Sequence, residues 1–160
     1  MRESLAIKVG KFQNNYKLIF ILLIFFLLDV IKPLGFSLNT EFVMLGIIFL
    51  SINFSFPFSL FTSFAFGILR DIFSPLFPNF SLQLVLLSLF IKYLDRHLPP
   101  HPLSDISKAG FAILGYVAIN SLLRQKLSLI FSISFFLHSF VCFFLIKYFL
   151  ERWMFNLSGR

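Results

Sequence analysis

Residues 65–75 read AFGILRDIFSP, which places an adjacent Arg and Asp at the end of a long apolar run. Gly67 precedes Asp71 by four residues in this stretch. An ionised side chain in or near a lipid bilayer costs free energy, so a charged pair at this position needs a structural or functional reason. We therefore expect Arg70 and Asp71 to end a helix and to make specific contacts there.

The composition of the whole chain is typical of an integral membrane protein. Apolar residues make up 58% of the 160 residues and charged residues only 13%, and the mean hydropathy is +0.90. Soluble domains carry about 25% charged residues, so this chain has too little polar surface to cover a globule in water. The net charge of +7 comes from basic residues that lie between apolar runs. Such residues set membrane orientation, so we expect no nucleic-acid binding.

Six apolar runs predict an all-α fold, a polytopic membrane helix bundle with about six transmembrane helices. They form a single transmembrane domain over residues 1–160, with spans near 16–31, 41–53, 56–69, 82–94, 109–123 and 127–150. The first run follows several basic residues, as in a secretory signal, but no small-residue cleavage site follows it. We expect it to remain as the first span. Several runs are shorter than the roughly 20 residues that cross a bilayer, so they must tilt, recruit flanking residues or sit in a thinned membrane.

The region 42–69 allows two interpretations. It forms either one helix kinked at Pro57 or two short helices that turn within residues 51–57. A single helix would be about 42 Å long, which exceeds the hydrocarbon thickness. With two helices, and so six spans, 10 of the 14 Lys and Arg residues lie inside and 4 outside, whereas five spans divide them 7 to 7. Because cytoplasmic loops are enriched in Lys and Arg, we expect six spans with both termini cytoplasmic.

Catalytic, cofactor-binding and metal-ligating residues are not expected. Cys142 is the only cysteine, which excludes an intrachain disulfide and a cysteine-based metal cluster. His97 and His101 have a ligand-like spacing, but Pro99 and Pro100 between them break the helix that a shared ligand face requires. The segment 92–108 is instead expected to be a cytoplasmic contact surface, whose Lys and Arg side chains meet anionic lipid headgroups or an acidic partner.

Seven residues near the predicted outer ends of the helices are the candidate site for structure and partner contact. They are Asp29, Lys32, Gly67, Arg70, Asp71, Arg124 and Lys126.

Two interpretations of these residues compete. An aspartyl dyad of Asp29 and Asp71 would share a proton and activate water, as in membrane-embedded aspartic peptidases. Each Asp has a basic residue within three positions, however, which favours its ionised form, and no Asn- or Gly-rich motif surrounds either. We therefore favour ion pairing that fixes helix depth, including an Asp29–Lys32 pair.

The third predicted helix also carries small residues, at Ser63, Ala65 and Gly67, beneath its charged end. Small side chains let another backbone approach closely, so this surface is expected to pack or dock against a helix. Asp71 is expected to hold the third helix against the hairpin that carries Arg124 and Lys126.

In these features the chain resembles the MreD family of bacterial membrane proteins. The resemblance lies in length, span pattern and the central stretch 58–94, where Gly67-x-x-x-Asp71 ends one helix and the next ends in KYL at 92–94. One departure is FPNF at 77–80, where many members have a glycine soon after the Asp.

The resemblance implies a non-catalytic scaffold of the rod-shape, or elongation, complex in the bacterial inner (plasma) membrane, without a cofactor. Such a scaffold helps position lateral peptidoglycan synthesis and maintain cell shape. Its implied partners are an MreC-like bitopic protein, the lipid bilayer and, indirectly, an MreB-like filament and RodA-like and class B penicillin-binding synthases.

The main alternative is a substrate-binding subunit of an energy-coupling-factor vitamin transporter, also a six-span protein of similar size. This alternative predicts an outward-facing pocket and an Ala-x-x-x-Ala face on the first helix. Residues 18–28 read LIFILLIFFLL and are bulky throughout, which counts against a transporter.

Overall fold

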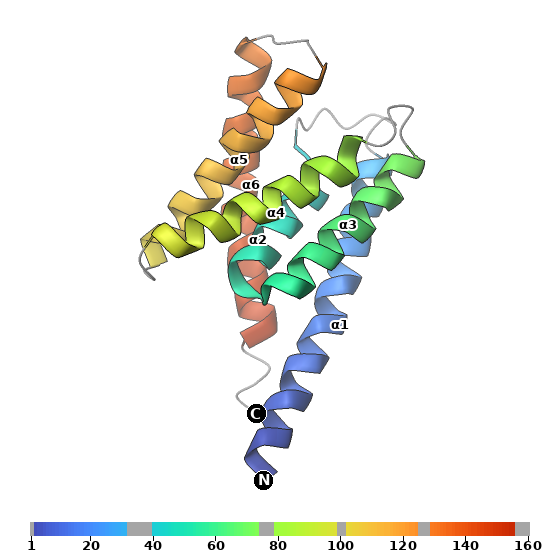
Figure 1. Ribbon diagram of the computed structural model, residues 1–160, viewed down its shortest axis with the longest axis vertical. Coiled ribbons are helices and arrows are strands. Elements are labelled where there is room, and N and C mark those ends of the chain that lie inside the picture. Colours follow the sequence, from blue (N-terminus) through green and yellow to red (C-terminus); the bar gives the residue numbers. More distant parts are fainter. Residues whose placement is uncertain (1, 32–39, 74–78, 99–101, 125–128, 156–160) are drawn as a thin grey trace.

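The computed structural model describes residues 2–31, 40–73, 79–98, 102–124 and 129–155, with positions 2–15, 102–103, 121–124, 129–131 and 153–155 described as backbone only. Within these ranges the fold is all-α and has six helices (Figure 1). The helices are α1 (Arg2–Ile31), α2 (Phe42–Asn53), α3 (Phe56–Ile72), α4 (Asn79–His97), α5 (Pro102–Arg124) and α6 (Leu129–Phe155). The predicted all-α class is therefore confirmed.

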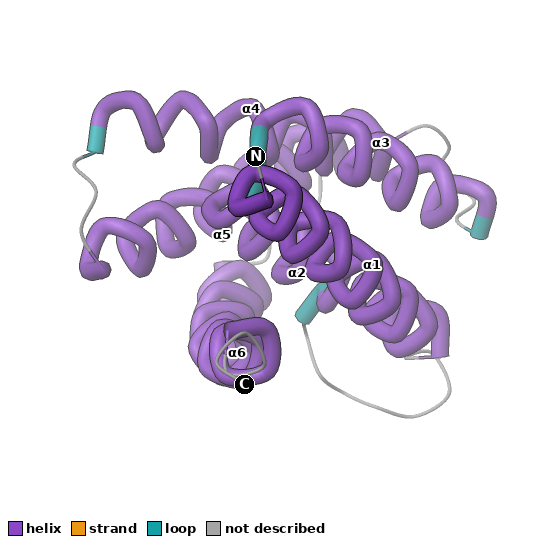
Figure 2. Tube along the Cα trace, turned by 90° about the horizontal axis from the view of Figure 1, so that it is seen from below, coloured by secondary structure: helices purple, strands orange, loops and turns teal. Residues whose placement is uncertain are grey.

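The shortest helix, α2, forms the centre of the bundle. Nine of its 12 residues are buried, from Val43 to Ser51, and it contacts each of the other five helices. Figure 2 shows α2 in the middle of the bundle, with the longer helices around it. A helix that is apolar on every side is stable only where every side is covered, which explains its central place.

The chain turns between α2 and α3, so the two-helix interpretation of residues 42–69 is correct. Phe54 has extended backbone angles (φ −119°, ψ 169°), and Ser55 is the N-cap of α3. Pro57 lies in the first turn of α3, where a missing amide hydrogen costs nothing. Because of this turn, the chain changes direction after every helix, and the start of α1 and the end of α6 point to the same end of the bundle (Figure 1).

Most helices extend beyond the apolar runs that predicted them. Helix α1 begins at Arg2 instead of residue 16, α4 covers Asn79–His97 instead of 82–94, and α5 begins at Pro102 instead of 109. Hydropathy marks only the apolar part of a helix, and polar flanks continue a helix until a breaker stops it. In α4 the breaker is Pro99, and Leu98 still donates its N–H to the Leu94 carbonyl at 2.9 Å. Residues 92–97 are thus helical and not part of a loop.

The outer surfaces of five helices carry large exposed apolar side chains. Examples are Phe20 on α1, Phe61 on α3, Leu82 on α4, Phe111 on α5 and Phe149 on α6, and Phe61 is 73% exposed. Among the described residues, one helical segment, Ser132–Arg152 of α6, has both the length and the apolar composition of a membrane span.

Helices α3 and α4 meet at Gly67 without a side chain between their backbones. A Cβ atom added at Gly67 would lie 2.3 Å from the Ser81 Cα, far inside van der Waals contact. One and two turns earlier on the same face of α3 lie Ser63 and Ser59, both fully buried. Ser88 of α4 donates to the Ser59 hydroxyl at 3.3 Å and accepts from Ser51 of α2 at 3.1 Å. The small-residue face of α3 therefore packs against α4 of the same chain.

The substitution Gly67→Ala should destabilise the fold, because its methyl group meets backbone atoms of α4 that cannot turn aside. Overpacking of this kind costs about 1–3 kcal/mol. Gly110→Ala is the matched control, since it makes the same change within a helix but its Cβ would lie 3.4 Å from the Phe140 ring. Thermal unfolding in detergent should show a lower midpoint for Gly67→Ala alone. Equal midpoints for the two variants would contradict the close approach.

Candidate functional site

The carboxylate of Asp29, in the last turn of α1, caps the start of α2. Its Oδ1 accepts the Phe42 N–H and its Oδ2 accepts the Val43 N–H, both at 2.9 Å. The first amides of a helix have no partner within the helix, and its dipole favours a negative charge there. Glu41, the N-cap residue itself, makes no side-chain capping bond. Asp29 fills this role, and its side chain is only 1% exposed.

Asp71, in the last turn of α3, caps the start of α4 in the same way. Its Oδ1 accepts the Phe80 N–H at 2.8 Å and its Oδ2 accepts the Ser81 N–H at 2.9 Å. Asp71 is 1% exposed. The cap fixes the start of α4 against the end of α3, next to the contact between Gly67 and Ser81.

Arg70 binds two carboxylates from other helices. Its Nη1 lies 2.8 Å from Asp29 Oδ2 and its Nη2 lies 3.4 Å from Glu41 Oε1. The guanidinium carbon lies 4.4 Å from the centre of the Phe80 ring, in cation–π geometry. The planar fork of an arginine suits such a bridge, because separate nitrogens reach separate acceptors. Arg70 therefore ties α3 to α1 and to the start of α2, and it packs on α4.

Tyr116 of α5 extends this arrangement to a fourth helix. Its hydroxyl donates a hydrogen bond to Glu41 Oε2, and its side chain is fully buried. We call Asp29, Glu41, Arg70 and Tyr116 the Asp29 cluster. It connects α1, α3 and α5 at the start of α2.

The structure brings four of the seven predicted site residues together at this end of the bundle, namely Asp29, Gly67, Arg70 and Asp71. Lys32 and Lys126 lie outside the described residues, and Arg124 is described as backbone only. The closest basic partner described for Asp29 is Arg70, 41 residues away.

The Asp71 carboxylate holds α4, through two backbone amides. Its expected contact with the hairpin that carries Arg124 and Lys126 stays a prediction, because neither of those side chains is among the described ones. Sequence reasoning missed Glu41 and Tyr116. Glu41 carries a local signal, because it directly precedes the apolar run of α2. Tyr116 gives no such local signal, because it lies inside an apolar segment.

A second charged group lies at the opposite end of the bundle, where α4, α5 and α6 meet. Lys108 Nζ lies 2.6 Å from Asp95 and 3.5 Å from Asp105. Lys147 Nζ lies 3.7 Å from Asp105 and 3.6 Å from Glu151. We call these five residues the Lys108 cluster. The Lys108 side chain is 4% exposed, so the expectation that it meets lipid headgroups is wrong.

Asp29, Asp71 and His97 each contact backbone groups in the described part of the chain. Both oxygens of Asp29 accept backbone N–H groups from the start of α2, and both oxygens of Asp71 accept backbone N–H groups from the start of α4. His97 Nδ1 lies 2.8 Å from the Tyr93 carbonyl oxygen, and His101 falls outside the described residues. No group of three or more His, Cys, Asp or Glu residues suited to a metal occurs among the residues described.

Gln83 of α4 is the least satisfied polar residue of the interior. Its side chain is fully buried, and neither amide atom has a hydrogen-bond partner among the described residues. Such a group lowers stability unless water or another polar group reaches it.

Comparison of the chain with protein-family models, with curated proteins and with solved structures found no match.

Replacing Asp71 by Ala should lower the free energy of unfolding by about 2 kcal/mol or more, because two buried amides lose their acceptor. Asp71→Asn keeps one oxygen in place and should cost clearly less. Asp105→Ala, which removes a partly exposed carboxylate of the Lys108 cluster, is the control and should have a small effect. Thermal or denaturant unfolding in detergent measures all three. Equal losses for the Ala and Asn variants at position 71 would show that capping is not the role of this carboxylate.

Proposed function

We propose that this chain is a non-catalytic scaffold of the MreD type in the bacterial inner membrane. It crosses the membrane six times, with both termini in the cytoplasm, and helps position lateral peptidoglycan synthesis through an MreC-like bitopic partner. The observation that carries the proposal is the use of both candidate carboxylates, Asp29 and Asp71, as helix caps. Groups that a membrane enzyme would use for chemistry hold the helices together in this chain.

The distribution of charge and apolar surface supports a membrane position. The Asp29 cluster lies at one end of the bundle and the Lys108 cluster at the other, and exposed Phe and Leu side chains cover the helices between them. Charged side chains near a bilayer are expected to be paired and to face the bundle interior. Helix α2, about 18 Å long by its 12 residues, is too short to span the hydrocarbon alone, and in the bundle the other helices shield it from lipid.

The carboxylate geometry favours a scaffold over an aspartic peptidase. In such an enzyme two carboxylates share a proton and hold a water molecule for attack. Here Asp29 Oδ2 also binds Arg70 at 2.8 Å, and the two carboxylates accept amides from the starts of two different helices, α2 and α4.

The vitamin-transporter alternative gains no support from α1. The face of α1 that points outward carries Phe20, Leu23 and Leu27, all exposed and bulky. A helix that docks through small residues needs a surface on which backbones approach, and this face does not offer one.

The proposed topology predicts that reporters fused within the turn at Phe54–Ser55 and after the last residue both report the cytoplasm. The reason is the 10-to-4 division of Lys and Arg between the two sides. A fusion within 74–78 serves as the opposite control and should report the periplasmic side. An exported C-terminus would contradict the six-span arrangement.

Affinity purification of the tagged full chain from native membranes in mild detergent tests the proposed role. We expect it to retain the MreC-like bitopic protein of the same genome. Arg152→Gln, a change of an exposed residue at the end of α6, should leave this retention intact. Retention of a transporter ATPase pair in place of the bitopic protein would overturn the proposal in favour of the transporter alternative.

A further inference from the structure

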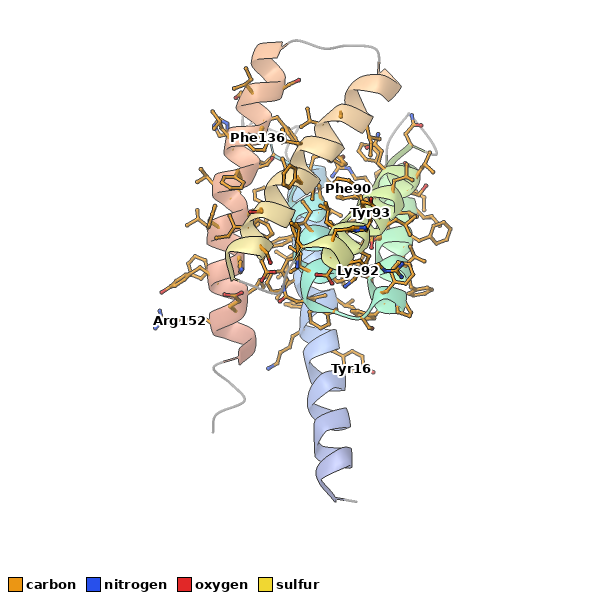
Figure 3. The ribbon with its side chains drawn as sticks, turned by 60° about the vertical axis from the view of Figure 1, so that its left-hand side comes forward. Tyr16, Phe90, Lys92, Tyr93, Phe136 and Arg152 are labelled. Atoms are coloured by element: carbon orange, nitrogen blue, oxygen red, sulfur yellow. The ribbon has the colours of Figure 1, made fainter. Side chains whose placement is uncertain are left out.

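A hollow of about 340 Å³ opens where the start of α3 meets the end of α4. It is lined by Phe56, Leu89, Lys92, Tyr93, Asp95 and Arg96. Figure 3 shows Lys92 and Tyr93 close together on α4, well apart from Arg152 on α6. The hollow thus combines two cations, one acid, a tyrosine ring and an aliphatic side chain from about two turns of α4 with the Phe56 ring of α3.

The charged side chains of this hollow differ in how many hydrogen bonds and ion pairs they make with the rest of the protein. Asp95 is neutralised mainly from outside the hollow, since its Oδ1 lies 2.6 Å from the buried Lys108 ammonium. Lys92 donates to the Phe54 carbonyl at 3.0 Å and lies 3.8 Å from Asp95, but an ammonium group has three hydrogens to donate. Arg96 is exposed and makes no hydrogen bond or ion pair within the described part of the chain. The hollow therefore has donor capacity and positive charge left for an anion.

The surface of α4 that leads to the hollow has the polarity profile of a phospholipid. Leu82, Leu86, Leu89, Tyr93 and Arg96 follow one another at spacings of three and four, which places them on one side of the helix. All five are exposed. Along this side the chain presents three leucines, then a tyrosine, then an arginine. Acyl chains, the interfacial region and the phosphate layer of a membrane occur in the same order, and Tyr and Arg are typical of the last two.

We propose that this hollow binds the phosphate-bearing headgroup of an anionic diacyl phospholipid of the cytoplasmic leaflet. Arg96 and Lys92 donate to the phosphate oxygens, the Tyr93 ring covers the ester region, and an acyl chain lies along Leu89, Leu86 and Leu82. Basic pockets between helices on the cytoplasmic side of membrane proteins suit such headgroups. The orientation rests on the proposed function, which places this end of the bundle in the cytoplasm.

The test compares lipid retention by the purified full chain in nanodiscs of mixed phosphatidylglycerol and phosphatidylcholine, read by native mass spectrometry. The wild type should retain phosphatidylglycerol in preference to phosphatidylcholine. Arg96→Gln should lower that preference about fivefold, the factor expected for one cation at an anionic membrane surface. Arg152→Gln is the matched control, because it removes an exposed arginine at the same end of the bundle but on α6, and it should leave the preference unchanged.

Three results would overturn the inference. Equal retention of the two lipids by the wild type would reduce the hollow to an apolar groove. An equal loss in both arginine variants would mean that only diffuse surface charge attracts the lipid. Displacement of the bound lipid by soluble glycerol phosphate at comparable concentration would assign the site to a water-soluble phosphate compound.

The same preparation separates this inference from the proposed function. Retention of the bitopic partner by the wild type is measured in mild detergent, and lipid preference is measured in nanodiscs. A chain that binds phosphatidylglycerol through Arg96 without the bitopic partner supports the lipid site and contradicts the scaffold role. A chain that binds the partner but shows no lipid preference supports the scaffold role and contradicts the lipid site.

Discussion

At the start of α2, the Asp29 carboxylate accepts two backbone N–H groups at 2.9 Å each and also binds Arg70 at 2.8 Å. The central helix of the bundle begins at this point, and four helices meet there. Burying a carboxylate to 1% exposure costs much free energy unless such donors surround it. Removal of Arg70 would leave two acids, Asp29 and Glu41, with less compensation. Removal of Asp29 would leave two amides without this acceptor and the guanidinium with Glu41 as its remaining carboxylate. The positions of α1, α2 and α3 at this end are therefore mutually dependent.

The same capping device occurs twice along the chain. Asp29 in the last turn of α1 caps α2, and Asp71 in the last turn of α3 caps α4, each through two consecutive amides. The sequences around them, LLDV at 27–30 and LRDI at 69–72, are alike in only the Leu, the Asp and the branched residue that follows. In both cases an acid fixes where the next helix begins after a connecting segment. Arg70 adds the link between the two units, because it lies beside one capping acid in sequence and binds the other in space.

The sequence was sufficient for the number of helices, for the turn near Pro57 and for the structural importance of Arg70 and Asp71, because hydropathy and proline are local signals. Partner choice was not predictable in the same way. Arg70 binds Asp29 from 41 residues away, a contact that no local spacing predicts, since helix packing decides which side chains meet. Lys108 lies in a polar segment and was expected on the surface. Its burial follows from the extension of α4 and α5 beyond their apolar runs, which brings Asp95 and Asp105 around it.

Because α2 is enclosed by the other helices, its backbone amides reach solvent less easily than those of the outer helices. Local fluctuations expose the amides of a helix most readily where one side of that helix already faces solvent or lipid. Helix α2 has no such side over residues 43–51, and every other helix packs against it. Its amides therefore exchange with solvent only when the whole bundle separates, whereas those of α6, much of whose surface is exposed, are released by lesser motions. The shortest helix of the chain thus reports the global stability of the fold.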